Sequence, residues 1–308
     1  MRNITVRQLR YVEALARLGH FGRAASDCAV SQPALSVAVR ELEDSLGAPL
    51  FERGPRHVRL SGFGAEFVRR TRAILRDIDE LEDMARASRD ALAGQLRLGV
   101  IPTVAPYLLP AILGGLAATY PAMEVKVRET VTPTLIADLS DGRLDAAILA
   151  LPVPETAFDS AEILTEPFVL VRPVADAAAP VPARDDLRGM RLLLLEEGHC
   201  FRDQALSFCD MRGGDTRDAL DGSSLTTIVQ MVAAGMGVTL IPEMAVPVET
   251  RLGDVVAVHF ADPQPTRTLG MIWRRTSPLA PQLDQMAATV RAAVRPSTKP
   301  RRTGYNAA

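Results

Sequence analysis

Two cysteines nine residues apart stand in a segment rich in polar side chains. Residues 198–209 read GHCFRDQALSFC, so Cys200 and Cys209 flank a stretch of Arg, Asp and Gln. Cys200 follows the apolar stretch Leu192–Leu195, which we expect to be a strand, and lies near the start of the next predicted helix. A helix N-terminus and a nearby arginine such as Arg202 both favour the thiolate, the nucleophilic form of cysteine. Spacing alone leaves a second interpretation open, in which both cysteines are small buried packing residues.

The composition excludes several classes of protein. Three cysteines in 308 residues cannot form the disulfide scaffold of a small secreted domain. The longest apolar run, Thr227–Pro242, is shorter than the roughly 18 residues of a membrane span and contains Gln230. The N-terminal sequence MRNITVRQLRYVE lacks the apolar region of a signal peptide. With 47% hydrophobic and 23% charged residues, we expect a folded, cytoplasmic protein of two or three domains that has no contact with a membrane.

The formal net charge of −2 is the average of two unlike parts. Residues 1–76 hold thirteen arginines, no lysine and seven acidic residues, which gives +6. The remaining residues hold 22 basic and 30 acidic side chains, which gives −8. A basic head on an acidic body indicates that the head meets a polyanion such as a nucleic acid.

The basic head is predicted to contain three short helices. Thr5 can cap a first helix that ends at Gly19, and a second helix is expected at Gly22–Cys28. Ser31 is a favourable N-cap for a third helix, which ends at Gly47. In this third helix, spacings of four, three and four define one buried stripe, made of Leu35, Val39, Leu42 and Leu46.

A wing and a long linker helix are predicted to follow. Arg53 and Arg56 lie in a basic turn, which leads into a short strand at His57–Leu60. From Gly62 to about Ala91 the pattern is helical, and positions 67, 71, 74, 78, 81 and 85 alternate in steps of four and three. Five of these six positions are apolar, which predicts a coiled-coil seam between two copies; the alternative is a helix packed on its own domain. The seam residues that we expect to form the dimer contact are Phe67, Ile74, Ile78 and Leu81.

From Gly94 onward, predicted strands alternate with predicted helices. The strands are Gln95–Ile101, Met123–Val131, Ala146–Leu149, Phe168–Val171, Arg191–Leu195, Val238–Ile241 and Leu269–Arg274. The helices are Pro106–Tyr120, Thr134–Ser140, one from about Arg202, Leu225–Ala234 and one from about Leu279 to Val294. This alternation predicts an α/β domain of two lobes, with a ligand at the carboxyl ends of strands.

We therefore divide the chain into a basic head at residues 1–60, a linker and dimerisation helix at 61–92 and an α/β domain at 93–300. Lobe I of this domain comprises about 93–165 and 267–300, and lobe II about 166–266. The tail at 301–308 lacks periodicity, and we expect it to be disordered.

The head resembles a known family. Phe21–Arg53 reads FGRAASDCAVSQPALSVAVRELEDSLGAPLFER, and its AAxxxxxSQPALSxxxxxLE core resembles the signature of LysR-type transcriptional regulators. The resemblance spans essentially the whole chain and implies a winged helix-turn-helix, a long linker helix and a two-lobed domain like the periplasmic binding proteins.

The second helix of a helix-turn-helix enters the major groove of double-stranded DNA. Gln32 can present a donor and an acceptor to a base edge, and Arg40 can reach guanine or a phosphate. Pro33 lies in the first turn of the same helix and is tolerated there. The positions that we expect on the DNA-binding surface are Arg7, Ser31, Gln32, Pro33, Ser36, Arg40, Arg53 and Arg56.

Residues 198–209 resemble the redox-active segment of the peroxide-sensing members of this family. The resemblance implies that Cys200 is the peroxidatic cysteine, that Cys209 is the resolving one, and that the two form a reversible disulfide. It also implies that five residues bind or polarise hydrogen peroxide, namely Thr103, Thr132, His199, Arg202 and Asp203.

The same resemblance implies partners and a place of action. We expect an activator of oxidative-stress defence genes that binds promoter DNA and RNA polymerase at the nucleoid. Family members are homodimers that assemble into homotetramers, and thiol reductants of the glutaredoxin or thioredoxin class would reset the disulfide.

The spacing of the two cysteines has a mechanical consequence. In a continuous helix the Cα atoms of Cys200 and Cys209 would be roughly 13 Å apart and on opposite faces. A disulfide needs Cα atoms within about 7 Å of each other. The segment must therefore unwind before the disulfide forms, so oxidation would remodel the lobe and, through it, the spacing of the DNA-binding heads.

Other reactive groups have structural interpretations. Cys28 lies inside the helix-turn-helix, where we expect a packed thiol. His20, His57 and His259 are scattered and lack the spacing of metal ligands, so we assign no metal. The chain has no phosphate-binding glycine loop, and we assign no cofactor.

Three functions compete on this basis. The first is a peroxide-sensing LysR-type activator. The second is a LysR-type regulator that binds a small metabolite between its lobes, with both cysteines incidental. The third, a thiol peroxidase, is disfavoured because a helix-turn-helix and a linker helix have no role in such an enzyme, so we expect a protein that is not an enzyme.

Overall fold

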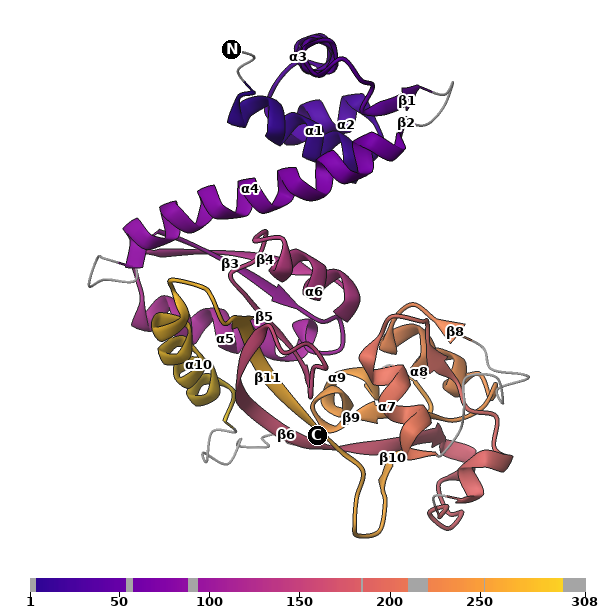
Figure 1. The fold of residues 1–308 in the computed structure, drawn as a ribbon. Coiled ribbons are helices and arrows are strands. Elements are labelled where there is room, and N and C mark those ends of the chain that lie inside the picture. The colour runs from indigo at the N-terminus through magenta and orange to yellow at the C-terminus, as the bar shows by residue number, and fades with distance from the viewer. Residues whose placement is uncertain are drawn as a thin grey trace, which may run out of the picture. The chain divides into compact units, whose positions relative to one another are not determined.

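The computed structural model describes residues 4–53, 58–87, 94–183, 185–209, 221–251 and 253–295. Its internal contacts divide the chain into two compact units, Met1–Ala85 and Arg86–Ala308 (Figure 1). The first unit is a helical head with a small hairpin, and the second is an α/β body. The predicted fold class is thereby confirmed.

The head unit contains four helices and a two-stranded wing: α1 (Val6–Leu18), α2 (Phe21–Asp27), α3 (Gln32–Leu46), β1 (Phe51–Arg53), β2 (Val58–Leu60) and α4 (Gly62–Ala87). Local sequence signals set the helix ends. The Thr5 hydroxyl accepts from the Gln8 backbone N–H at 3.2 Å, and the Gln8 side chain accepts from the Thr5 N–H at 3.1 Å, which is a capping box. Gly19 and Gly47 end α1 and α3 with φ of +61° and +71°, a conformation that glycine adopts without strain.

The wing is tied to both α3 and α4. The Glu43 carboxylate on α3 accepts hydrogen bonds from the backbone N–H groups of Leu50, at 2.8 Å, and Phe51, at 3.1 Å. A Cβ on Gly64 of α4 would stand 1.9 Å from the Leu50 carbonyl oxygen, so this approach of α4 to the chain before the wing requires glycine. These contacts fix the wing beside the second helix of the helix-turn-helix.

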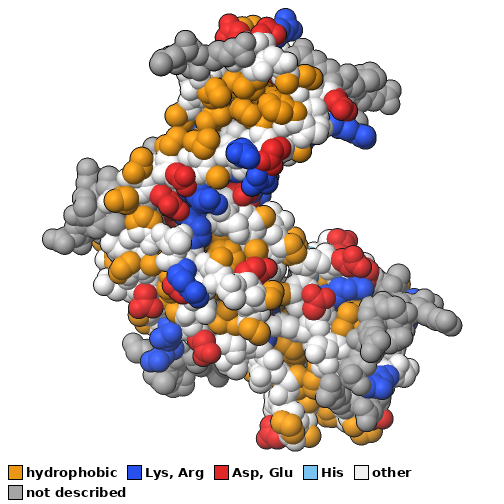
Figure 2. All heavy atoms as spheres, in the orientation of Figure 1, with side chains coloured by type: hydrophobic (Ala, Val, Ile, Leu, Met, Phe, Trp, Pro, Cys, Tyr) orange, Lys and Arg blue, Asp and Glu red, His pale blue; other side chains and the backbone are white. Residues whose placement is uncertain are grey.

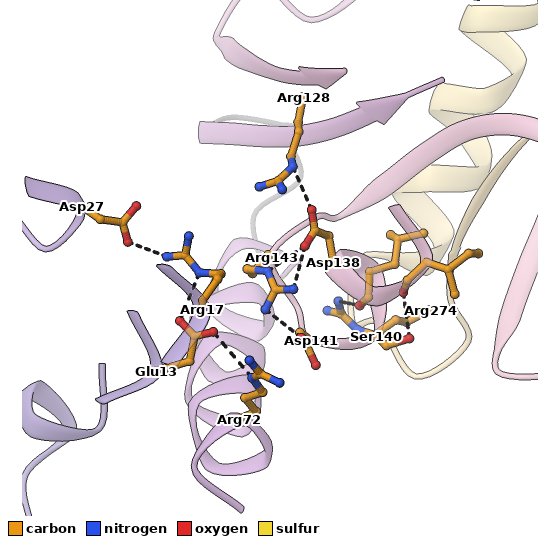
Figure 3. Close-up of polar contacts among 12 residues, drawn as sticks. Glu13, Arg17, Asp27, Arg72, Arg128, Asp138, Ser140, Asp141, Arg143 and Arg274 are labelled. Carbon is orange, nitrogen blue, oxygen red and sulfur yellow. Dashed lines mark hydrogen bonds and ion pairs between the residues drawn. The ribbon is translucent and has the colours of Figure 1, made fainter. Parts of the chain in front are cut away.

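Ion pairs join three helices of the head (Figure 3). Arg17 on α1 pairs with Asp27 on α2 at 2.5 Å and with Glu13 on its own helix at 3.5 Å. Arg72 on α4 faces the same Glu13 at 3.6 Å. The helix-turn-helix and the linker helix therefore meet around Glu13, whose side chain is only 13% exposed.

Lobe I of the body contains the parallel strands β3 (Gly94–Val100), β4 (Met123–Glu129) and β5 (Ala146–Leu151), followed in the sheet by β11 (Thr266–Arg274). The helices α5 (Ala105–Thr119), α6 (Thr132–Ser140) and α10 (Ala280–Val294) cover this sheet, and α5 and α10 lie side by side (Figure 1). Asp138 of α6 is 2% exposed and pairs with Arg143, at 2.7 Å, and with Arg128 of β4, at 2.9 Å (Figure 3). These pairs hold α6 against the edge of the sheet.

Strand β6 (Phe158–Pro173) belongs to both lobes (Figure 1). Its first part, residues 158–167, pairs with β11 in lobe I. Its second part pairs with β9 (Thr239–Pro242) on one side and with β10 (Val255–His259) on the other, in lobe II. Each lobe has its own buried cluster of hydrophobic side chains, and β6 contributes to both clusters.

Lobe II is completed by short elements that follow β6: η1 (Val174–Asp176), η2 (Asp185–Gly189), β7 (Leu194–Leu195), α7 (Cys200–Phe208), β8 (Asp221–Gly222), α8 (Leu225–Ala233), η3 (Glu243–Ala245) and α9 (Val246–Glu249). β7 and β8 are parallel neighbours, and a bridge between Leu192 and Val238 links this pair to the chain before β9. Four residues separate the end of β7 from the start of α7, so the candidate redox segment lies at the carboxyl end of a strand, where it was predicted.

The structure corrects several predicted boundaries. The strand predicted at Phe168–Val171 is the second part of β6, because the same strand begins at Phe158 and its first part, Phe158–Pro167, pairs with β11. The strand predicted at Arg191–Leu195 is shorter in the structure, which has β7 at Leu194–Leu195 and an isolated bridge at Leu192. The helix predicted from about Arg202 begins at Cys200, which makes this cysteine its first residue. β10 was not predicted at all.

Candidate redox site and DNA-binding surface

The exposed side of α3 carries most of the residues predicted to face DNA. Ser31 caps the helix, and its hydroxyl accepts from the Ala34 N–H at 3.4 Å. Gln32, Pro33 and Arg40 are exposed and Ser36 is half-buried. Their helix is anchored from the other side by the fully buried side chains of Leu35, Val39 and Leu42. The first two turns of α3 thus present polar groups outward on a rigid support, as major-groove readout requires.

The predicted DNA-binding surface includes three further arginines, which are Arg7, Arg53 and Arg56. Arg7 is exposed on α1, donates from Nε to the Tyr11 hydroxyl at 2.5 Å and lies over the Tyr11 ring. Arg53 is the last residue of β1, and its side chain lies outside the description. Arg56 lies outside the described residues, so its predicted role in the wing stays a prediction.

The predicted dimer seam on α4 divides into two kinds of side chain. Phe67 packs against the core of the head, and Thr71 at the next seam position is 1% exposed. Ile74 and Leu81 are 47% and 65% exposed, and Ile78 is half-buried. Figure 2 shows hydrophobic side chains gathered on one face of the head unit. Ile74 and Leu81 are therefore exposed, whereas Phe67 and Thr71 are used within the head, and the dimer contact itself stays a prediction.

Cys200 is carried by lobe II and packs against lobe I. Gly198 has φ of +94° and turns the chain after β7, His199 is the N-cap, and Cys200 is the first residue of α7. The Cys200 side chain is half-buried and packs against the hydrophobic cluster of lobe I. A Cβ on Gly198 would stand 3.6 Å from the Val131 side chain, so the turn lies beside the start of α6. The thiol is therefore placed at the contact between the two lobes.

Thr132 and Thr103 contribute hydroxyl groups from lobe I. Thr132 is the first residue of α6, directly after Val131, and its Oγ1 is buried with no hydrogen-bond partner among the described residues. Thr103 follows β3 and is 3% exposed. The Thr103 Oγ1 accepts from Arg267 Nη1 at 2.9 Å, and the Thr103 carbonyl accepts from Arg267 Nη2 at 3.1 Å. Because Oγ1 acts as the acceptor in this contact, the hydroxyl proton of Thr103 is available to a ligand.

A buried ion pair supports Thr103 from behind. The side chain of Arg267 is 0% exposed and that of Glu166 is 5% exposed, and Arg267 Nε donates to Glu166 Oε1 at 2.8 Å. The second oxygen of Glu166 accepts from the Met244 backbone N–H at 2.9 Å. The guanidinium lies over the ring of Phe201, the residue after Cys200, at 5.3 Å. This network joins β11, β6 and the chain after β9 to the first turn of α7, and neither Arg267 nor Glu166 was predicted from the sequence to belong to the site.

The polar residues around Cys200 differ in burial and in their contacts. Arg202 is 7% exposed, and its Nη1 donates to the Leu195 carbonyl at 2.7 Å and to Asp221 Oδ1 at 2.5 Å. It therefore ties α7 to the ends of β7 and β8. His199 is 8% exposed, and burial lowers its pKa, against the opposing charge of Glu196. Asp203 is exposed on the first turn of α7.

Cys209 caps the other end of α7. Its side chain is 0% exposed and belongs to the core of lobe II. Because α7 is one unbroken helix from Cys200 to Phe208, the Cα atoms of the two cysteines are separated by about 13 Å, and neither sulfur is part of a disulfide. The predicted helical separation is confirmed, so a bond between the two sulfur atoms requires α7 to unwind.

A second polar contact joins the lobes. The Tyr107 hydroxyl on α5 donates to Glu249 Oε1 on α9 at 2.6 Å. Burial and this hydrogen bond raise the pKa of Tyr107 above its usual range, so the phenol keeps its proton and donates it to the carboxylate. Glu249 is 7% exposed.

The arrangement of the described residues bears on metal and membrane binding. No group of three or more His, Cys, Asp and Glu side chains is placed to hold a metal ion. In the same part of the chain, no helix is both long enough and apolar enough to span a bilayer.

Comparison with known proteins identifies both units. Residues 6–65 match the model of the bacterial regulatory helix-turn-helix protein, lysR family, and residues 89–295 match the LysR substrate binding domain. The DNA-binding transcriptional dual regulator OxyR of Escherichia coli is 42% identical over 94% of this chain and 95% of its own length. The hydrogen peroxide-inducible genes activator of Haemophilus influenzae is 39% identical over 93% of this chain and 96% of its own length.

Solved structures give the same relationship. A cysteine-to-aspartate variant of full-length OxyR from Pseudomonas aeruginosa superposes with a TM-score of 0.71 and 36% identity, covering 94% of this chain and 95% of that one. A peroxide-bound cysteine-to-serine variant of OxyR from Corynebacterium glutamicum gives a TM-score of 0.63 and 32% identity, covering 94% of this chain and 92% of that one.

Proposed function

The chain belongs to the LysR family of transcriptional regulators, and on that premise we propose that it is a DNA-binding regulator switched by hydrogen peroxide through Cys200 and Cys209. One observation carries the proposal. Cys200 begins α7 at the contact between the lobes, two residues after Gly198, which lies beside Val131 at the start of α6, while Cys209 lies one helix length away in the core of lobe II. Such an arrangement fits a reactive thiol at Cys200 and a second cysteine, Cys209, that can reach it only after a structural change.

The residues around Cys200 have separate roles in this proposal. Thr103, held by Arg267, donates its hydroxyl proton to one peroxide oxygen, and the unpartnered Oγ1 of Thr132 forms a second contact. His199 and Asp203 flank the thiol in sequence and complete the binding site. Arg202 acts by holding the first turn of α7 to β7 and β8.

The chemistry consumes one peroxide and two thiols. The Cys200 thiolate attacks one peroxide oxygen, the O–O bond breaks, hydroxide leaves and a sulfenic acid forms. The Cys209 sulfur then attacks the Cys200 sulfur, the S–O bond breaks and water leaves with the proton of the Cys209 thiol. A dithiol reductant of the glutaredoxin or thioredoxin class reverses the disulfide by exchange.

Disulfide formation changes the body of the protein because α7 must unwind and Cys209 must leave the core of lobe II. In a family assembly, a homodimer built on α4 and paired into a homotetramer, this change alters the spacing of the helix-turn-helix units on promoter DNA. The oxidised protein then recruits RNA polymerase to genes of oxidative-stress defence. Since its partner is chromosomal DNA, its place of action is the nucleoid in the cytoplasm.

A thiol count tests the proposal. The reduced chain is treated with hydrogen peroxide and its free thiols are alkylated. The masses of its peptides are then measured by mass spectrometry. We expect the loss of two hydrogens between Cys200 and Cys209, whereas Cys28 should stay alkylated in every sample. Cys200→Ser should bind promoter DNA and ignore peroxide, and Cys28→Ser serves as the matched control that keeps the response. If Cys200→Ser still responded to peroxide, a regulator that binds a metabolite between its lobes would be the better description.

A further inference from the structure

The end of α7 that carries Cys209 is held by contacts of different kinds. The Cys209 N–H donates to the Ala205 carbonyl at 3.0 Å, which closes the last turn of the helix. Its side chain is fully buried in the core of lobe II. Its carbonyl oxygen accepts a hydrogen bond from Arg188 Nε at 3.2 Å. Cys209 is thus fixed through its N–H, its side chain and its carbonyl.

Arg188 is well placed for this contact. It lies in η2, which is anchored in the same core by the fully buried side chain of Leu187, while Arg188 itself is exposed. The last carbonyl groups of a helix have no partner within the helix, and a cation at this end also interacts favourably with the helix dipole. Arg188 supplies both a donor and a positive charge to the end of α7.

We propose that Arg188 is a positioning residue that restrains the resolving cysteine, so that it slows disulfide closure and leaves the reaction of Cys200 with peroxide unchanged. The inference rests on the proposed function, since it concerns the second step of that reaction. It assigns a role in the reaction to η2, an element that lies outside the cysteine motif and outside the contact between the lobes.

The attack on peroxide and the closure of the disulfide differ in whether Cys209 has to move. Attack on peroxide takes place at Cys200, at the far end of α7, and needs no movement of Cys209. Closure must reduce the separation of the two Cα atoms from about 13 Å to about 7 Å or less, a shift of roughly 6 Å. A hydrogen bond of 3.2 Å does not survive such a shift of its acceptor. The contact between Arg188 and Cys209 is therefore lost in closure and kept in the step before it.

The covalent step is balanced without any further reagent. The Cys209 sulfur attacks the sulfenic sulfur of Cys200, the S–S bond forms and the S–O bond breaks. The leaving hydroxide takes the proton of the Cys209 thiol and departs as water. The oxidant is the hydrogen peroxide of the first step.

The test compares Arg188→Ala with Arg191→Ala in the full-length reduced protein. Arg191 is an exposed arginine three residues further along, and its backbone carbonyl, which the substitution keeps, accepts from the Val238 N–H at 3.0 Å. The protein is mixed with hydrogen peroxide and quenched at intervals with a thiol-alkylating reagent and a sulfenic-acid trap. Mass spectrometry then gives the two rate constants, and the first step is also measured in a Cys209→Ser background.

We expect Arg188→Ala to raise the rate constant of closure about three- to tenfold, the value of one partly exposed charged hydrogen bond. Its second-order rate constant with peroxide should match that of the unaltered protein, and Arg191→Ala should match in both steps. Equal closure rates in Arg188→Ala and Arg191→Ala would overturn the inference and leave the proposed function intact. An equal increase in both steps would overturn it as well, because it would indicate general loosening of lobe II. Absence of any Cys200–Cys209 disulfide in the unaltered protein would refute the proposed function, and the inference with it.

Discussion

Glu166→Gln should destabilise the body unit far more than a matched change on the same strand. The Glu166 carboxylate uses one oxygen for Arg267 and the other for the Met244 N–H, and the Arg267 side chain is 0% exposed. The amide keeps one acceptor and loses the charge that neutralises the guanidinium. A buried arginine is then left without its counter-charge, as happens when one partner of a buried ion pair is removed.

The expected size of this effect follows from the burial of the pair. Breaking a buried ion pair costs about 3–5 kcal/mol, and we take about 3 kcal/mol because glutamine still accepts one hydrogen bond. For a unit of about 200 residues, 1 kcal/mol corresponds to about 2–4 °C in Tm, so Tm should fall by about 6–12 °C. The control is Asp159→Asn, also on β6, whose pair with Arg275 at 3.0 Å is 43% and 61% exposed. An exposed pair contributes about 0–1 kcal/mol, so its Tm should change by no more than about 4 °C.

The single tryptophan makes the measurement specific. Trp273 lies on β11, the strand of Arg267, and is 4% exposed, so its fluorescence reports unfolding of the body unit in the intact protein. Both variants are melted in the reduced state at neutral pH. Equal shifts of Tm for Glu166→Gln and Asp159→Asn would refute the reasoning, because burial would then have no influence on the cost of removing the charge.

Other contacts lead to further expected outcomes. Tyr107→Phe leaves the buried Glu249 short of a donor and should cost about 1–3 kcal/mol in urea unfolding followed by Trp273 fluorescence; no change would show that the contact adds nothing to stability. Gln32→Ala should weaken binding to a selected duplex by about 1–3 kcal/mol and leave binding to a scrambled duplex unchanged in fluorescence anisotropy; equal losses on both duplexes would contradict base readout. Burial lowers the pKa of His199, so the unfolded chain binds a proton first as the pH falls. The stability due to neutral His199 is therefore complete above the ordinary histidine pKa of about 6.5 and declines below it, down to the lowered pKa of the folded state. The difference in Tm between the unaltered protein and His199→Gln should shrink from pH 7.5 to pH 5.5, and a constant difference would contradict this origin.

The helix ends of the head were predictable because their determinants are local. Thr5 and Ser31 cap the helices that follow them, and Gly19 and Gly47 end theirs with a positive φ. Each of these signals acts within about four residues of chain, so a single sequence contains all of it. The start of α7 was placed two residues late, because His199 is an N-cap whose side chain makes no capping hydrogen bond.

The strands were predicted less well because their determinants are distant. The first part of β6 has mixed burial, and its pairing with β11 joins residues about a hundred positions apart. Of the candidate site, the motif at residues 198–209 was visible in the sequence. The network of Arg267, Glu166 and Thr103 was not, because three separate strands or loops bring it together. An isolated arginine in a strand usually denotes a solvated edge, and only the fold shows that Arg267 is 0% exposed.

The anchoring of the two cysteines determines which of them moves. Cys200 is followed by Phe201, which is 3% exposed, packs on Phe168 at 5.0 Å between ring centroids and carries the buried guanidinium of Arg267 at 5.3 Å. Any displacement of Cys200 would pull on this network and on both lobes. Cys209 ends a helix of nine residues, and its carbonyl is held from the surface by Arg188. The end of a short helix opens at a lower free energy than a buried polar network that joins two lobes does. In the proposed mechanism the disulfide therefore forms by movement of Cys209 toward Cys200, and Thr103 and Thr132 of lobe I, the proposed contacts of the peroxide, stay in place.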